Sequence, residues 1–268
     1  MQRLSAPSSE RGPDVGRSVV TEALAHPRRP VDPPPAEADF QRRYRARIAL
    51  FLAGVVLATF ALSMIARTIN TLRALDVVEA ERDRWQRPED VLQALDLHEG
   101  QVAVDLGSGS GYFALRLSAA VGREGQVLAV DIRRVPLLFL RIRAVLRGRH
   151  NVRAVLGGLD DPHLPPSAVD AVLVADTYHE LTDRAAILDH AFRALRPGGR
   201  LVIVDPTPGA GAEDGPETAT HRYERPAAVE TELRGAGFAI LEREDRFIDS
   251  SRHRWWMIVA RRDASRTS

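Results

Sequence analysis

The chain has 268 residues, of which 44% are hydrophobic, and its 37 basic and 36 acidic residues leave a formal net charge of +1. This length allows a sizeable core in roughly one or two domains. The near-neutral charge excludes a global field that would draw the chain to nucleic acid, so no nucleic-acid partner is expected. The sequence contains no cysteine, which excludes disulfides, thiolate metal sites and a cysteine nucleophile.

The N-terminal region joins a polar stretch to one long uncharged segment. Residues 1–47 are rich in Pro and Arg, and we expect them to be disordered. No residue from Ile48 to Ala66 is charged. That length spans about 30 Å of hydrocarbon at ~1.5 Å per residue, which predicts a transmembrane helix over 48–69. A buried core helix or a cleaved signal sequence is the alternative, and the long preceding region disfavours a signal sequence.

A second helical pattern follows the uncharged segment. Apolar residues recur at mostly helical spacing over 70–87, which predicts an amphipathic helix that connects the membrane segment to a domain or caps it. Pro88 opens a short helix with Glu89 and Asp90 in its first turn, where acids are favoured. We expect the globular domain over 88–262 and a polar tail over 263–268.

From Gln101 onward, short apolar runs alternate with helical patterns. Strands are predicted at 102–106, 126–131, 152–156, 171–175, 200–205, 238–243 and 255–261. Helices are predicted at 112–121, 135–147, 183–195 and 226–235. The first five strands are nearly continuously apolar, so both of their faces are buried. This pattern predicts a doubly wound, Rossmann-like α/β domain with a parallel sheet covered by helices.

A glycine-rich turn follows the first strand, in the segment VAVDLGSGSGYF at 102–113. Glycines let the backbone approach a ligand closely, and the amides at the start of the next helix face that ligand. Proteins that bind NAD use a related G-x-G-x-x-G turn, so the turn alone does not name a cofactor. Here the spacing is G-x-G-x-G, preceded by Asp105. This arrangement resembles the motif of class I S-adenosylmethionine-dependent methyltransferases.

The resemblance implies roles for the residues of the turn. The turn would hold the methionine part of S-adenosylmethionine, and Asp105 would orient its amino group. The residues assigned to the turn are Gly107, Ser108, Gly109, Gly111 and Tyr112.

The second candidate is the carboxylate that ends the next strand. Asp131 can accept two hydrogen bonds from ribose hydroxyls, and Ile132 follows it along the cofactor. Dehydrogenases share this geometry, so Asp131 indicates a nucleoside cofactor without naming it. The alternative is an acid that merely ends a strand.

The third candidate is the segment 157–165, which packs on the adenine in methyltransferases of this type. The family often places an Asp directly after the first glycine, but Gly158 occupies that position here. We therefore transfer the adenine role to the Leu159 backbone and the Asp160 carboxylate.

The fourth candidate is the end of the central strand, in the segment VADTYHEL at 174–181. Ligands bind outside the carboxyl ends of parallel strands, so Asp176 is expected to face the cofactor. His179 is a candidate base near neutral pH, and Tyr178 or Glu180 a candidate for orienting the methyl acceptor. The alternative is that His179 packs on the adenine edge or satisfies a loop carbonyl. The histidines lack a recognisable metal spacing, so no metal is expected.

The segment R-P-G-G at 196–199 lies between a helix and a strand and matches the same family, in an architectural role. The resemblance implies a seven-stranded sheet of order 3-2-1-4-5-7-6 with the last inserted strand antiparallel. It also implies methyl transfer to a small molecule, in the manner of quinone and arsenite methyltransferases. Acceptor identity is expected to lie in 71–88 with Trp85, in the loop 205–225 with His221 and Tyr223, and in Tyr178.

Two alternatives stay open at this point: a non-catalytic, membrane-anchored sensor of S-adenosylmethionine and a NAD(P)-dependent oxidoreductase. The chain is expected to be a single-pass protein of a bacterial inner membrane. Six arginines precede the uncharged segment and four follow it in a comparable window, which favours an external domain. Because the cofactor is made in the cytosol, we place the domain in the cytoplasm. The pattern does not indicate an oligomeric state.

Overall fold

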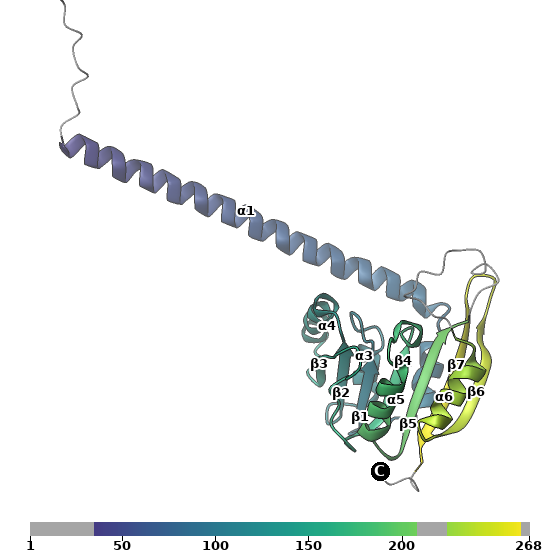
Figure 1. The fold of residues 1–268 in the computed structure, drawn as a ribbon. Coiled ribbons are helices and arrows are strands. Elements are labelled where there is room, and N and C mark those ends of the chain that lie inside the picture. The colour runs from purple at the N-terminus through teal and green to yellow at the C-terminus, as the bar shows by residue number, and fades with distance from the viewer. Residues whose placement is uncertain (1–34, 208–223, 264–268) are drawn as a thin grey trace, which may run out of the picture. The chain divides into compact units, whose positions relative to one another are not determined.

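The computed structural model describes residues 35–207 and 224–263 (Figure 1). The chain divides into two units, Met1–Leu62 and Ser63–Ser268. The described part of the first unit is the beginning of helix α1, which runs from Pro35 to Asp83. The second unit holds the end of α1 and the α/β domain.

Helix α1 corrects two of the predicted boundaries. The expected disorder up to residue 47 is wrong for residues 35–47, which are helical, while residues 1–34 lie outside the described part. Proline fits the first position of a helix, and no further proline occurs before Pro88. For the same reason the predicted helices over 48–69 and 70–87 form one uninterrupted helix, which ends at Asp83.

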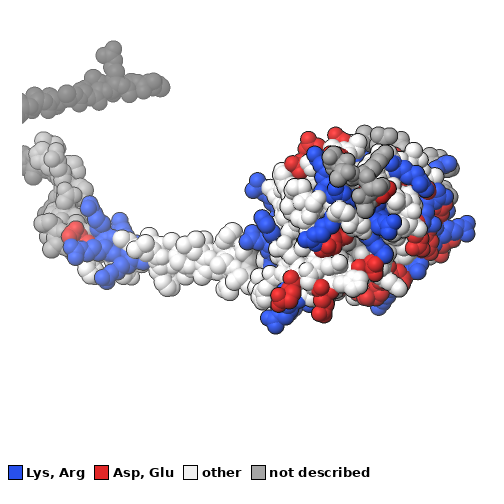
Figure 2. Space-filling model, turned by 90° about the horizontal axis from the view of Figure 1, so that it is seen from below, with Lys and Arg blue, Asp and Glu red and all other residues white. Residues whose placement is uncertain are grey.

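The N-terminal part of α1 is the candidate membrane span. Within the described residues, one helix is long and apolar enough to cross a membrane, and its most apolar window is exposed throughout. Figure 2 shows this uncharged stretch in white, with a group of arginines in blue at its N-terminal side. Exposure of so many large apolar side chains is typical of contact with lipid rather than water.

The domain is built on a seven-stranded sheet of order β3-β2-β1-β4-β5-β7-β6. The strands are β1 (Val102–Leu106), β2 (Gln126–Asp131), β3 (Val152–Leu156), β4 (Val169–Ala175), β5 (Leu195–Pro206), β6 (Phe238–Asp249) and β7 (Arg254–Arg262). Strand β7 pairs antiparallel with both β5 and β6, while the pairs among β1 to β5 are parallel. The predicted strand order and the antiparallel insertion are confirmed.

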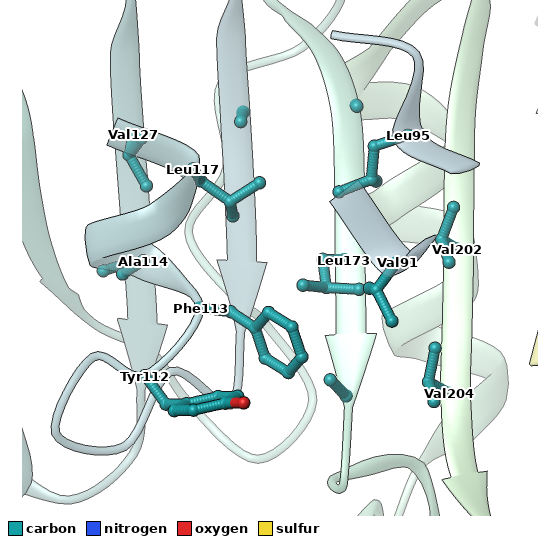
Figure 3. Packing of buried hydrophobic residues seen from close by; sticks show 14 of the residues in the cluster. Val91, Leu95, Tyr112, Phe113, Ala114, Leu117, Val127, Leu173, Val202 and Val204 are labelled. Carbon is teal, nitrogen blue, oxygen red and sulfur yellow. The ribbon is translucent and has the colours of Figure 1, made fainter. Parts of the chain in front are cut away.

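Helices cover both faces of the sheet. They are α2 (Pro88–Leu95), α3 (Ala114–Ala120), α4 (Arg134–Leu146), α5 (Arg184–Ala194) and α6 (Pro226–Gly235), with a short 3-10 helix at Tyr178–Glu180. The apolar residues of α2, α3 and α4 share one core, and those of α5 and α6 share the other. Figure 3 shows Val91 and Leu95 of α2 beside Leu173 and Val202 of the strands. This two-faced burial explains the continuous apolar runs of β1 to β5.

Candidate functional site

A cavity of about 510 Å³ lies at the carboxyl ends of β1, β2 and β4, the region where open parallel sheets bind ligands. Its volume falls within the ~300–1,000 Å³ usual for small-molecule sites. Ten of the predicted site residues line it: Asp105, Gly107, Ser108, Gly109, Tyr112, Asp131, Ile132, Leu159, Asp176 and Glu180. The structure therefore brings together motifs that are up to 75 residues apart in the sequence, from Asp105 to Glu180.

Two residues assigned to the cofactor lie outside the described lining of the cavity, Gly111 and Asp160. A Cβ atom on Gly111 would lie 2.3 Å from Cδ1 of Leu140, and the residue has a φ of +96°. Gly111 therefore permits the turn to pack on α4, and its contact with the cofactor stays a prediction. The Gly158 backbone lines the cavity in the segment where Asp160 was expected.

Gly107 sets the shape of the turn. Its φ is +81°, and a Cβ atom there would lie 2.2 Å from Oγ1 of Thr177. The backbone N–H groups of Gly107 and Ser108 donate to the Val130 carbonyl oxygen at 2.8 and 2.9 Å. The turn is thus held against β2 and close to the loop after β4, in a conformation that only glycine adopts without strain.

Asp105 presents an unpaired carboxylate oxygen in this cavity. The side chain is only 3% exposed, and its Oδ2 has no hydrogen-bond partner among the described residues. Burial raises the pKa of Asp105 to about 7, opposed by the backbone N–H of Ala114 and assisted by the negative charge of Asp131. The hydroxyl of Ser108 is likewise buried without a partner in the described part of the chain. Buried polar atoms of this kind on a cavity wall fit a polar, cationic ligand group.

Asp131 links the end of β2 to the glycine turn. Its Oδ2 accepts from the Gly109 N–H at 2.8 Å, and its Oδ1 accepts from the Arg133 N–H at 2.8 Å. Oδ1 also accepts from Nε of the exposed Arg133 side chain at 3.3 Å. These bonds fix the orientation of the carboxylate, while Oδ2 keeps a second acceptor site for a ligand hydroxyl. The geometry fits the predicted ribose contact.

Helix α1 supplies a wall of the cavity from the segment 71–88, in which acceptor identity was expected to lie. Thr71, Leu75 and Arg82 all line it. Nη2 of Arg82 lies 3.6 Å from Oδ2 of Asp176, and Cζ of the same guanidinium lies 4.4 Å from the centroid of the Tyr112 ring. The helical pattern of 70–87 indicated a helix, but its spacing carried no information about where that helix packs.

Asp176 occupies the turn directly after β4. Its φ of 56° lies in the left-handed region, and its N–H donates to the Val204 carbonyl at 2.8 Å. Left-handed backbone at a residue other than glycine is uncommon and is often found at functional sites. This conformation places the Asp176 side chain at the cavity, beside Arg82.

Tyr178 and His179 lie outside the described lining of the cavity, and their role beside the acceptor stays a prediction. The Tyr178 side chain is fully buried, and its hydroxyl donates to a Glu232 carboxylate oxygen. His179 Nδ1 lies 3.1 Å from both carboxylate oxygens of Asp205, which also accept the Thr177 and His179 N–H groups at 3.1 Å. This network holds the loop after β4 to the end of β5.

The charge of His179 follows from this network. Burial lowers its pKa, but the hydrogen bond and the negative charge of Asp205 raise it further, so the net shift is upward. The hydrogen bond to Asp205 also fixes the orientation of the His179 ring. Among the three predicted catalytic side chains, Glu180 is the one that lines the cavity.

The residues expected to select the acceptor are only partly placed. Trp85 stacks on His253, with ring centroids 3.9 Å apart and planes 6° apart, and therefore joins the loop after α1 to the β6–β7 hairpin. His221 and Tyr223 lie outside the described residues. In residues 35–207 and 224–263, no group of three or more His, Asp or Glu side chains is arranged to hold a metal ion, and the absence of a metal stays a prediction.

The arrangement of glycine turn, paired strand-end carboxylates and strand order agrees with a comparison of the sequence with protein families. Residues 97–246 match the model of a family described as "Methyltransferase domain". The chain belongs to this methyltransferase family. The match covers the whole cavity apart from the wall that α1 supplies.

Curated relatives of the methyltransferase domain include quinone enzymes. The chain is 26% identical over 122 residues to a demethylmenaquinone methyltransferase of Geobacillus stearothermophilus, covering 46% of this chain and 51% of the relative. It is 32% identical over 122 residues to a ubiquinone/menaquinone biosynthesis C-methyltransferase UbiE of Serratia proteamaculans, covering 45% and 48%. The chain thus spans about half the length of the curated relatives it matches.

Solved structures share the fold. A SAM-dependent methyltransferase from Aquifex aeolicus superposes with a TM-score of 0.56 at 25% identity, covering 65% of this chain and 89% of that one. The [4+2]-cyclase SpnF superposes with a TM-score of 0.58 at 19% identity, covering 67% and 82%, and shows the fold alone. The cofactor of the methyltransferase domain is S-adenosylmethionine.

Proposed function

We propose that the chain is a membrane-anchored methyltransferase that transfers a methyl group from S-adenosylmethionine to a small, lipid-soluble acceptor of the quinone class. The observation that carries this proposal is that α1 provides both the candidate membrane span and part of the cavity wall. Thr71 lines the cavity and lies five residues after Ala66, the end of the uncharged segment. At ~1.5 Å per residue this separation is about 8 Å along the helix.

The residues of the cavity fit the cofactor group by group. Asp105 offers its unpaired oxygen to the ammonium group, and Arg82 offers a cation to the carboxylate of the methionine part. Asp131 accepts from the ribose hydroxyls, and Ile132 and Leu159 supply apolar surface for the adenine. Each assignment pairs a charge or surface with its complement.

The cofactor supplies an activated methyl group on a sulfonium, so no nucleophile on the protein is needed. The chain's own task is to align an acceptor atom within about 3–3.5 Å of that carbon and to exclude water. An acceptor carbon or oxygen that gains a methyl group loses a proton, and we assign its acceptance to Glu180, one of the carboxylates that line the cavity. The acceptor-facing surface also includes Leu75 and Phe139.

Two independent observations support a quinone-class acceptor. The curated relatives with quinone names match the domain, and a lipid-soluble acceptor would reach a cavity beside a membrane helix directly. The domain is placed in the cytoplasm because the cofactor is made there. A C-terminal reporter that is active in only one compartment tests this orientation, and an external signal would contradict it.

Transfer of label tests the function. The full chain, in vesicles, is incubated with methyl-labelled S-adenosylmethionine and a bacterial lipid extract, and labelled products are identified by mass spectrometry. We expect one labelled, lipid-soluble product. Binding of label without transfer would instead support the sensor, and binding of NADH in place of the labelled cofactor would support the oxidoreductase.

A further inference from the structure

Exposed apolar side chains of the α/β domain are concentrated at one edge of its sheet. In the described residues from Pro88 onward, eight large hydrophobic residues are exposed, and seven of them lie within 132–159. These seven form what we call the α4 patch: Ile132, Val135, Leu138, Val145, Leu146, Leu156 and Leu159. Exposed apolar residues scattered singly need no explanation, but a concentration in one stretch marks an interaction surface.

Helix α4 has two apolar faces. Leu137, Leu140 and Ala144 are buried in the core beneath it. Leu138 and Val145 lie seven residues apart on its outer side, with 55% and 68% of their surface exposed. A surface helix ordinarily has one apolar face and one polar face, so the outer face of α4 is unpartnered within the described structure.

The surroundings of the α4 patch are cationic. Residues 132–159 contain seven arginines and no Asp or Glu. Three of the arginines pair with carboxylates, since Arg133 contacts Asp131 while Arg143 and Arg147 contact Glu79 and Asp76 of α1. The remaining four form no ion pair with a described residue: Arg134, Arg141, Arg149 and Arg153. Arginines beside an apolar helix face match a bilayer surface that carries anionic headgroups.

The α4 patch is continuous with the cavity. Ile132, Val135 and Leu159 belong to the patch and also line the cavity. The ion pair of Arg147 with Asp76, at 2.7 Å, joins α4 to α1 ten residues beyond Ala66, which is about 15 Å along the helix. The C-terminal end of α4 is therefore tied to the part of α1 that belongs to the same unit as the domain.

We propose that the α4 patch docks on the surface of a bilayer containing anionic lipids, so that the cavity opens toward the boundary between headgroups and acyl chains. Docking would give a lipid-soluble acceptor a route to the cavity that avoids water. The acceptor route rests on the proposed function, whereas the docking itself does not. A second copy of the chain is the competing occupant of an apolar patch, but the four arginines that form no ion pair with a described residue would repel those of the other copy.

The absence of cysteine allows a direct test. Val145→Cys carries an environment-sensitive fluorophore in the full chain, reconstituted in vesicles of phosphatidylcholine alone or with phosphatidylglycerol. The matched control is Leu241→Cys on β6, the eighth exposed hydrophobic residue, which lies outside the patch. We expect a blue shift, and quenching by a bilayer-embedded quencher, at position 145 in the anionic vesicles and at neither composition for position 241.

Two results would overturn the docking proposal. Equal emission at position 145 in both lipid compositions would exclude an anionic surface as the occupant. A shift that depends on the number of chains per vesicle rather than on lipid charge would identify a second copy of the chain as the occupant.

Charge reversal adds a functional readout. Arg134→Glu with Arg141→Glu is expected to abolish the lipid-dependent shift and to raise the KM for a lipid-soluble acceptor at least about fivefold, with cofactor affinity unchanged. Arg123→Glu with Arg252→Glu, both exposed and outside 132–159, is the control and should change neither quantity. An unchanged shift in the first variant would contradict the proposal. If the wild-type chain methylates no acceptor, the proposed function fails while the fluorescence still decides the docking.

Discussion

Two walls of the cavity differ in whether a short sequence motif encodes them. The wall formed by the ends of β1 and β2 consists of Asp105, the glycine turn and Asp131, which are encoded in two short stretches of sequence. A second wall consists of the end of α1, which contributes Thr71, Leu75 and Arg82 and carries no motif. The first wall belongs to the matched family region, and the second precedes it. The wall with the sequence motifs therefore lies in the part that the chain shares with the family, and the wall from α1 lies in a part that the family model does not cover.

The largest effect is expected at the glycine turn. Gly107→Ala adds a Cβ atom 2.2 Å from Oγ1 of Thr177 at a φ of +81°, so either the turn or the loop after β4 must move. We expect cofactor affinity to fall at least ~100-fold, and stability to fall by the ~1–3 kcal/mol typical of a strained backbone position. Calorimetric titration and thermal unfolding measure the two effects.

Gly109→Ala is the matched control for that change. Gly109 has a φ of +51°, but a Cβ atom there meets nothing within 4 Å. The Gly109→Ala variant should therefore lose only the ~1–2 kcal/mol of stability that left-handed backbone costs a residue other than glycine. Equal losses of cofactor affinity and of stability in the two variants would show that the close approach to Thr177 is unimportant.

The next effect concerns the carboxylate in the same wall. Asp105→Asn removes the charge that is proposed to hold the ammonium group, and a hydrogen bond to a charged group contributes about 1.5–3 kcal/mol. We expect the Kd for S-adenosylmethionine to rise by about 10- to 150-fold while the cofactor-free domain keeps or gains stability, because a buried charge is removed. Loss of stability together with unchanged affinity would contradict this role.

The pH dependence of Asp105 has a defined sign. Its pKa in the folded cofactor-free domain, about 7, lies above the ordinary value of 3.8. The folded state therefore binds the proton more tightly, and this group lowers the free energy of unfolding as pH rises from about 4 to about 7. Since the ammonium group requires ionised Asp105, cofactor affinity should rise over the same range in the wild type and be flatter in Asp105→Asn. Calorimetric titration of both proteins with S-adenosylmethionine between pH 5 and pH 8 measures this difference in pH dependence.

A smaller effect is expected on the wall that α1 supplies. Arg82→Gln removes the cation proposed to contact the cofactor carboxylate and releases Asp176, which lies 3.6 Å away. We expect cofactor affinity to fall about tenfold, which corresponds to ~1.4 kcal/mol. Arg84→Gln is the control, because Arg84 is largely exposed and pairs with Glu81. If both variants bind the cofactor like the wild type, α1 shapes the cavity without binding the cofactor.

The smallest effect is expected at the buried network behind the cavity. Tyr178→Phe removes the hydroxyl that donates to Glu232 but leaves the ring in the core. We expect a stability loss of about 1–2 kcal/mol, from the lost hydrogen bond and the carboxylate left without it, and a kcat within about twofold of the wild type. A large fall in kcat at unchanged stability would instead support the predicted catalytic role of Tyr178.

The sequence predicted β1, β2 and β3 with their observed bounds, because buried parallel strands leave an uninterrupted apolar run between turns. It did not predict that β6 continues to Asp249, since a long antiparallel hairpin is stabilised by pairing with β7 and needs no apolar run. The order of the strands came from the family resemblance.

Local chemistry therefore determined most of the cofactor wall by itself. Backbone freedom at glycine and a carboxylate at a strand end are properties of a few neighbouring residues, so Gly107 and Asp131 could be singled out from local sequence, and the resemblance added Asp105. All three line the cavity. Tertiary structure alone decided that His179 pairs with Asp205, that Arg82 reaches the cavity and that α4 keeps an outer apolar face. Each of these depends on how separate elements pack, and periodicity within one element does not contain that information.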